Sequence, residues 1–167
     1  MTVVFYISAI IAVAAAALPA ISKTRFRNAR RGISPALGML APHKTNEDVC
    51  VPLSEIPALL AYIGELERAY GVPVPTFGHI GDGNLHVNFM YDRRVDEQRE
   101  KVAEGVSKLM ARVVALGGTI TGEHGVGIAK ASFLPLEQRP AEFAYASRVK
   151  ARFDEQGLLN PSKIFTG

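Results

Sequence analysis

The chain has 167 residues, of which 48% are hydrophobic and 21% charged, and its formal net charge is +3. This length suits one domain or part of one, and the hydrophobic content is enough for a folded core, which argues against a disordered chain. The net charge is too small to indicate a nucleic-acid-binding protein. The single cysteine, Cys50, excludes an internal disulfide, fits a reducing compartment, and lies in an apolar run that predicts a buried, unreactive thiol.

Residues 3–22 carry no charge, and a stretch of about 20 apolar residues is long enough to span a bilayer. Basic residues cluster directly after it, in residues 23–31, and would hold that end in the cytoplasm. No basic residue precedes the apolar run, which disfavours a signal peptide. Two interpretations stay open, a membrane anchor and a buried or orphaned helix. We therefore expect a cytoplasmic chain, associated with a membrane if residues 3–22 are an anchor.

Residues 41–52 are predicted to be a loop that enters a strand. The following segment, residues 54–70, has the pattern of a helix. Ser54 can cap its first turn, Pro57 is tolerated there, and Gly71 can end it. Its apolar positions share one face, which is typical of a helix packed on a core. These positions are Ile56, Leu59, Leu60, Ile63, Leu66 and Tyr70.

Two short strands are predicted next, at residues 72–77 and 85–91, with turn residues between them. The turn would set His79 at the end of one strand and His86 at the start of the next. Asn88 lies two residues beyond His86, so its side chain would point to the same face. The sequence therefore predicts two imidazoles close together at a glycine-rich turn.

The remaining elements complete a fold. Residues 95–116 read as a second amphipathic helix ended by two glycines, and residues 119–121 read as a short strand. Residues 140–156 read as a third helix, with Phe143, Ala146, Val149 and Phe153 facing inward. The order strand, helix, strand, strand, helix, strand predicts an α+β fold of the ferredoxin-like split βαβ type. Its antiparallel sheet would carry helices on one side, and a helical segment would follow at the C-terminus.

A second polar cluster follows the last predicted strand, in residues 121–127 (Thr-Gly-Glu-His-Gly-Val-Gly). Two histidines and one carboxylate, here His79, His86 and Glu123, are the pattern of catalytic zinc sites, and the same ligands suit manganese or iron. The flanking glycines would let the backbone come close to a ligand or cofactor. The alternative is that the two histidines only cap the turn and Glu123 is a solvated charge.

Three motifs together resemble a known family. They are residues 78–86 (Gly-His-Ile-Gly-Asp-Gly-Asn-Leu-His), residues 122–127, and an ending with Phe153-Asp154 followed by residues 157–163 (Gly-Leu-Leu-Asn-Pro-Ser-Lys). This chain is similar to the C-terminal portion of the FAD-linked oxidases, a family that includes glycolate oxidase, D-lactate dehydrogenase and D-2-hydroxyglutarate dehydrogenase. The resemblance implies that residues 23–167 are this family's C-terminal cap and substrate domain. Residues 1–22 would then be an anchor or the remnant of a cap-domain helix.

The resemblance also implies roles for individual residues. A divalent metal, zinc or manganese, would lie beside a general base, and the substrate would be a D-2-hydroxy acid oxidised by FAD. Arg30 could equally belong to the basic flank, and Asn46 stands where some members carry a substrate-binding lysine. The implied residues are His79, His86 and Glu123 for the metal, His124 as the base, Arg30, Ser34 and Asn88 for the substrate, and Gly122, Gly125, Asn160 and Lys163 for the cofactor.

No segment resembles the flavin-binding domain of this family. The expected function is therefore the substrate- and metal-binding part of an FAD-dependent hydroxy-acid dehydrogenase or oxidase of the glycolate or D-lactate type. It is expected to be inactive without a flavin-binding domain, which would be a partner subunit or a missing N-terminal domain. Two alternatives stay open: a metal-binding or scaffold protein without redox activity, and a module anchored in a membrane through residues 3–22.

Overall fold

The computed structural model describes residues 32–33 and 35–165, so the apolar segment 3–22, Arg30 and Ser34 lie outside the described residues. Across the described part of the chain, no helix has the length and apolar character needed to cross a membrane. The first described element is a short 3-10 turn, η1 (Leu37–Met39), and it precedes the sheet.

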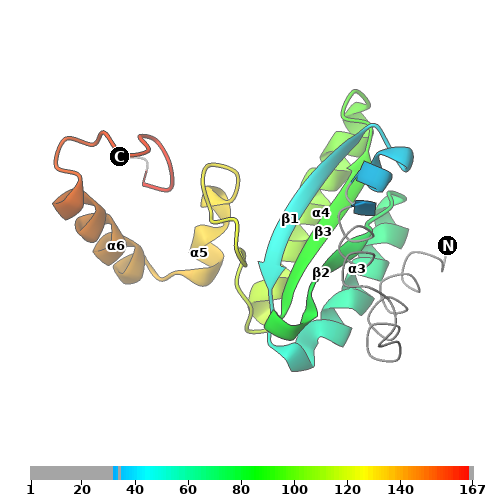
Figure 1. Ribbon diagram of the computed structural model, residues 1–167, viewed down its shortest axis with the longest axis horizontal. Helices are drawn as coiled ribbons and strands as arrows, with labels where there is room; N and C mark the ends of the chain where they lie inside the picture. The colour runs from blue at the N-terminus through cyan, green and yellow to red at the C-terminus, as the bar shows by residue number, and fades with distance from the viewer. Residues whose placement is uncertain (1–31, 34, 166–167) are drawn as a thin grey trace.

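Three antiparallel strands form the sheet: β1 (His43–Cys50), β2 (Thr76–His79) and β3 (Asn84–Tyr91). Their order is β1-β3-β2, so β3 is the central strand (Figure 1). Two helices, α3 (Ile56–Tyr70) and α4 (Asp96–Ala115), pack together and cover one face of the sheet. The predicted α+β class, with an antiparallel sheet and helices on one side, is confirmed.

The core lies between this face of the sheet and the two helices. Alternate residues of β3 point into it, because successive side chains of a strand face opposite sides. Gly105 lets α4 approach closely, since a Cβ there would lie 3.0 Å from the ring of Phe89. Buried members of this core include Val49, Leu59, Ile63, Leu85, Val87, Phe89, Val106, Leu109 and Val113.

The helix boundaries follow the sequence signals closely. Gly71 adopts a left-handed conformation, with φ of 65°, directly after α3, as predicted. The predicted Ser54 cap is wrong: α3 begins after a 3-10 turn, η2 (Leu53–Glu55), and the Ser54 hydroxyl donates to the Glu55 carboxylate instead. Pro57 lies in the first turn of α3, where its missing N–H costs nothing.

The segment before β2 is only partly a strand. The carbonyls of Pro73 and Pro75 accept the N–H groups of Met90 and Asn88, so residues 73–75 do follow β3. Proline has no N–H to return, and the regular ladder begins only at Thr76. The predicted strand at residues 72–77 is therefore displaced towards His79.

The predicted strand at residues 119–121 is reduced to a single bridge. Thr119 and Cys50 exchange two backbone hydrogen bonds, of 2.8 and 3.1 Å, on the edge of β1 that β3 does not use. The chain then leaves the sheet as a loop, residues 121–130. A 3-10 turn, η4 (Ala131–Phe133), and a short helix, α5 (Leu134–Glu137), follow this loop.

The last helix, α6 (Pro140–Phe153), stands apart from the sheet together with the C-terminal segment (Figure 1). Its predicted inward face is only partly buried against the described residues. Phe143 and Ala146 are half-buried, whereas Val149 and Phe153 are 41% and 82% exposed. The helical pattern of α6 is confirmed, but only the start of its apolar face, at Phe143, packs against the described core.

Candidate metal centre

The turn between β2 and β3 brings the two predicted histidines together. A 3-10 turn, η3 (Ile80–Asp82), separates the strands, and Gly83 follows it with φ of 73°. A Cβ at Gly83 would lie 2.1 Å from the carbonyl oxygen of Val51, so only glycine fits there. As a result, the rings of His79 and His86 lie edge to face with their centroids 5.8 Å apart.

The loop of residues 121–130 adds the predicted carboxylate. Glu123 Oε1 lies 3.4 Å from His86 Nε2 and 3.7 Å from His79 Nε2. His124 stacks on His86 with the ring centroids 5.4 Å apart, and its Nε2 is 4.0 Å from the same carboxylate oxygen. Both residues are about half exposed, so the cluster opens to solvent on this side.

The geometry of His79, His86 and Glu123 fits a divalent metal. One ligand atom from each residue lies within 4.8 Å of the others. Tetrahedral zinc with ligands at about 2.0–2.1 Å holds its ligand atoms roughly 3.3 Å apart, close to the two nitrogen–oxygen distances observed here. Two imidazole nitrogens and one carboxylate leave a fourth position, which is the pattern of a catalytic rather than a structural site.

A residue that the sequence analysis missed holds this cluster together. The carboxylate of Asp48, on β1, is fully buried, and its Oδ2 accepts the backbone N–H groups of Gly122, Glu123 and His124 at 2.9, 2.7 and 2.8 Å. Burial alone would raise the pKa of Asp48, but these N–H groups and the nearby charges of His124 and Lys130 outweigh it and lower the pKa. The carboxylate is therefore ionised and fixes the start of the loop.

Asp48 also faces His86. Its Oδ1 lies 3.7 Å from His86 Nδ1, and among the described residues neither buried atom has a hydrogen-bond partner. Burial lowers the pKa of His86, although Asp48 and Glu123 oppose the shift. A neutral imidazole with its proton on Nδ1, towards Asp48, presents the lone pair of Nε2 to the side of Glu123. The sequence signal that could have revealed this role is an aspartate within a predicted strand, where aspartate is uncommon.

Gly122 lets the loop pass close to β3. A Cβ at this position would lie 2.7–2.9 Å from the side-chain atoms of Asn84. Asn84 is only 6% exposed, and its Oδ1 has no hydrogen-bond partner in the described structure. Gly125, the second predicted cofactor-binding glycine, lies in the same loop with φ of 78°. The two glycines thus shape the loop, and their contact with a cofactor stays a prediction.

Asn88 shares the face of His86 but is fully buried. Its amide donates to the carbonyls of Pro75 and His86, and its oxygen accepts a hydrogen bond from Asn46. Contact with a substrate would need the second lone pair of that oxygen or the loss of one of these bonds. The substrate-binding role of Asn88 therefore stays a prediction.

The structure does not bring the C-terminal motif to the cluster. Asn160 and Lys163 are exposed, and Asn160 has φ of 48°. Their segment, drawn in orange and red, stands apart from the sheet (Figure 1). Their contact with a flavin therefore stays a prediction.

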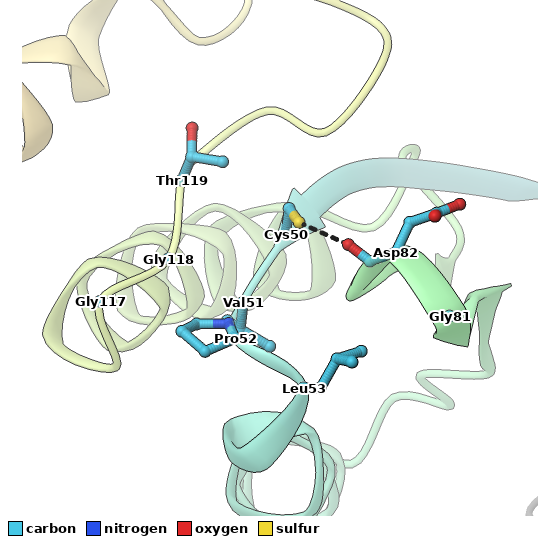
Figure 2. Close-up of a pocket in the computed structure, with 9 residues that line it drawn as sticks. All are labelled: Cys50, Val51, Pro52, Leu53, Gly81, Asp82, Gly117, Gly118 and Thr119. Atoms are coloured by element: carbon cyan, nitrogen blue, oxygen red, sulfur yellow. Dashed lines mark hydrogen bonds between the residues drawn. The ribbon is translucent and has the colours of Figure 1, made fainter.

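Cys50 is half-buried, so the prediction of a buried thiol is wrong. Its Sγ donates to the carbonyl oxygen of Asp82 at 3.2 Å, beside an open pocket of about 410 Å³ (Figure 2). Thr119, Gly118 and Pro52 are among the other residues that line this pocket. The side chain of Cys50 therefore lines this pocket, although its backbone is paired with Thr119.

Known proteins with similar sequences point to one family. Glycolate oxidase subunit GlcD of Bacillus subtilis is 39% identical over 137 residues, which are 82% of this chain and 29% of that protein. D-2-hydroxyglutarate dehydrogenase of Stutzerimonas stutzeri is 36% identical over 140 residues, or 81% of this chain and 30% of that protein. D-lactate dehydrogenase of Archaeoglobus fulgidus is 39% identical over 118 residues, or 70% of this chain and 26% of that protein.

The chain thus spans less than a third of the length of these curated relatives. A family model described as "FAD linked oxidases, C-terminal domain" matches residues 7–164. The matched region contains the histidine pair, the glutamate and the buried aspartate of the cluster. The chain belongs to the family of FAD-linked oxidases and corresponds to their C-terminal domain.

Proposed function

We propose that this chain is the substrate- and metal-binding part of an FAD-dependent D-2-hydroxy acid dehydrogenase or oxidase of the glycolate or D-lactate type. One observation carries the proposal. The Nε2 atoms of His79 and His86 both face one carboxylate oxygen of Glu123. The buried carboxylate of Asp48 lies next to the other ring nitrogen of His86. If the two histidines only capped the turn, a buried carboxylate beside His86 would not be needed.

Each residue of such a site would have its own role. A zinc or manganese ion on His79, His86 and Glu123 would supply a Lewis acid that lowers the pKa of a bound hydroxyl group. His124 is half exposed and stacked beside His86, where it can accept the hydroxyl proton as a general base. Asp48 keeps His86 in the required orientation.

Further residues would complete the proposed substrate and cofactor sites. Arg30 would bind the substrate carboxylate through its guanidinium fork, with Ser34 beside it. FAD would accept the electrons of the oxidation and would be held mainly by a flavin-binding domain. We expect Gly122, Gly125, Asn160 and Lys163 to face that cofactor.

The C-terminal region supports the need for a flavin-binding partner. Several of its large apolar side chains are mostly exposed, and exposed apolar patches mark interaction sites. A flavin-binding domain, in a separate subunit or a longer chain, would cover them. The exposed fractions are 64% for Tyr145, 82% for Phe153, 70% for Leu158 and 60% for Leu159.

Metal content tests the proposal most directly. The 167-residue chain would be purified without added metal and analysed by mass spectrometry, beside a His79→Ala, His86→Ala variant. We expect about one divalent ion per chain, which the variant loses. A His43→Ala variant is the matched control, since His43 contacts Asp92 at the other end of the sheet. A folded chain that takes up neither zinc nor manganese when both are supplied would contradict the proposed site.

A second candidate is a metal-binding or scaffold protein without redox activity. It is favoured by the fact that this chain alone supplies all three proposed metal ligands. The chain would be mixed with separately produced flavin-binding domains of the glycolate oxidase and D-lactate dehydrogenase types. Flavin reduction by glycolate or D-lactate would support the oxidoreductase, whereas metal binding without flavin reduction in any mixture would support the second candidate.

Residues 3–22 stay a candidate membrane anchor. If they are one, the chain should need detergent to remain in solution, because about 20 apolar residues would otherwise face water. Deleting residues 1–22 should then remove this need. Equal solubility of both chains without detergent would argue for a helix that packs against protein.

A further inference from the structure

The loop of residues 121–130 ends on a buried cation. Residues 122–129 are exposed or half-buried, whereas Lys130 is only 6% exposed. Its Nζ donates to the carbonyl oxygens of Asp48 at 2.6 Å and Ile120 at 2.8 Å. Lysine is almost never buried unless it is paired, and here Glu47 Oε2 lies 3.7 Å from Nζ. The three donors of the ammonium thus face three oxygens.

This ammonium replaces the missing part of the fourth strand. If the antiparallel ladder continued past the bridge between Cys50 and Thr119, the next hydrogen-bonded pair would be Asp48 and Thr121. Instead, the carbonyl of Asp48 accepts the Lys130 ammonium, while its carboxylate accepts three N–H groups of the loop. Both ends of the loop are therefore tied to one residue of β1.

We propose that Lys130 is a positioning residue, whose ammonium fixes the loop of residues 121–130 so that Glu123 and His124 stay beside His79 and His86. This inference rests on the proposed metal site. Between the two ties, the loop has few buried side chains to hold it, and two of its glycines have positive φ. Loss of the second tie would let Glu123 leave the position in which it faces both histidines.

Glu47 serves as the counter-charge of this tie. It is 8% exposed, and an unpaired buried cation or carboxylate would be strongly unfavourable. Replacing both members of a buried ion pair by well-packed hydrophobic side chains of similar volume is often nearly neutral for stability. Both charges can therefore be removed at once. Any change in the loop can then be measured in a chain that still folds.

The test compares zinc binding and folding in four forms of the full 167-residue chain. They are the wild type, Lys130→Met, the Glu47→Met, Lys130→Met double variant, and Lys101→Met as a control in an exposed ion pair of α4. Zinc affinity would be measured by competition with a chromophoric chelator. We expect the double variant to unfold near the wild-type temperature but to bind zinc roughly 10- to 100-fold more weakly, the usual effect of losing an outer support of a metal ligand. Lys101→Met should match the wild type.

Amide hydrogen exchange of the metal-free chains gives a second readout. The N–H groups of residues 122–124 should exchange at least about tenfold faster in the double variant, because they open with the loop. A stable double variant with wild-type zinc affinity and wild-type exchange would overturn the inference. Failure of the double variant to fold would overturn it too, because the pair would then belong to the core. If the wild type binds no zinc, the proposed site fails, and the exchange rates alone decide whether Lys130 holds the loop.

Discussion

The carboxylate of Asp48 and the imidazole of His86 face each other across adjacent strands. The two residues are register partners in β1 and β3, and Oδ1 of the first lies 3.7 Å from Nδ1 of the second. The other oxygen of Asp48 accepts three N–H groups of the loop that carries Glu123 and His124. One buried carboxylate therefore faces one expected metal ligand on the sheet and accepts hydrogen bonds from the loop that carries another.

Asp48→Asn should weaken zinc binding roughly 10- to 100-fold, because the neutral amide no longer orients and polarises His86. Asp48→Ala should also lower the free energy of unfolding by about 1.5–3 kcal/mol, the typical contribution of a hydrogen bond to a charged group, because the loop loses the carboxylate that accepts its N–H groups. Chelator competition and urea denaturation would measure the two effects. Asp82→Asn, which changes an exposed carboxylate of η3, is the control and should alter neither. Equal zinc affinity in Asp48→Asn and the wild type would refute the role of Asp48.

Gly122→Ala should disturb the same site by steric means. The new methyl group would lie 2.7–2.9 Å from the buried side chain of Asn84, and overpacking of this kind typically costs about 1–3 kcal/mol. We expect zinc affinity to fall on the order of tenfold as the loop is displaced. Gly81→Ala is the matched control, because a Cβ there meets no described atom within 4 Å, and its effect should stay within about 0.5 kcal/mol. The Asn84→Ala, Gly122→Ala double variant should recover affinity, and no recovery would mean that the clash is not the cause.

Two phenylalanines should respond very differently to truncation. Phe89 of β3 is fully buried against α4, so Phe89→Ala should cost about 3–5 kcal/mol of unfolding free energy. Phe153 is 82% exposed at the end of α6, and Phe153→Ala should change the stability of this chain by less than about 0.5 kcal/mol. Thermal and urea denaturation would measure both. A large loss of stability in Phe153→Ala would show that α6 packs on residues outside the described part of the chain.

The turn after α6 should loosen in acid. Asp154 accepts hydrogen bonds from Lys150 and from the N–H groups of Leu158 and Leu159. The Lys150 ammonium is the main cause of the lowered pKa of Asp154, and the two N–H groups add to it. A carboxyl whose pKa is lowered by folding stabilises the folded form above its unfolded pKa of about 3.9, and this contribution is lost as the pH falls through the folded-state pKa.

Amide exchange of Leu158 and Leu159, followed by NMR from neutral to acidic pH, would check this expectation. Protection should persist through mildly acidic pH and disappear below the pKa of a free aspartate, about 3.9. The Asp154→Asn variant should show weaker protection without that acid-dependent step. An identical acid step in the variant would assign the loosening to another group.

Several features of the fold were readable in the sequence because each depends on neighbouring residues. The apolar spacing of α3 and α4, the glycine after α3 and the turn before β3 are local patterns, and the structure confirms them. The proximity of His79 and His86 followed from the same reasoning, because a tight turn places the ends of its two strands together. Ser54 was misjudged since a 3-10 turn precedes α3, and such turns have no strong sequence signal.

The sequence by itself thus determined the α+β class, the helices and the proximity of His79 and His86, because periodicity and turn chemistry act over a few positions. Only the tertiary structure showed that Asp48 and Lys130 contact each other and hold both ends of the loop that carries Glu123, since these hydrogen bonds join residues that are 74 to 82 positions apart in the sequence. It also ended the fourth strand after one bridge and left the apolar face of α6 exposed. Burial and long-range hydrogen bonding arise from how the whole chain packs, and no local pattern encodes them.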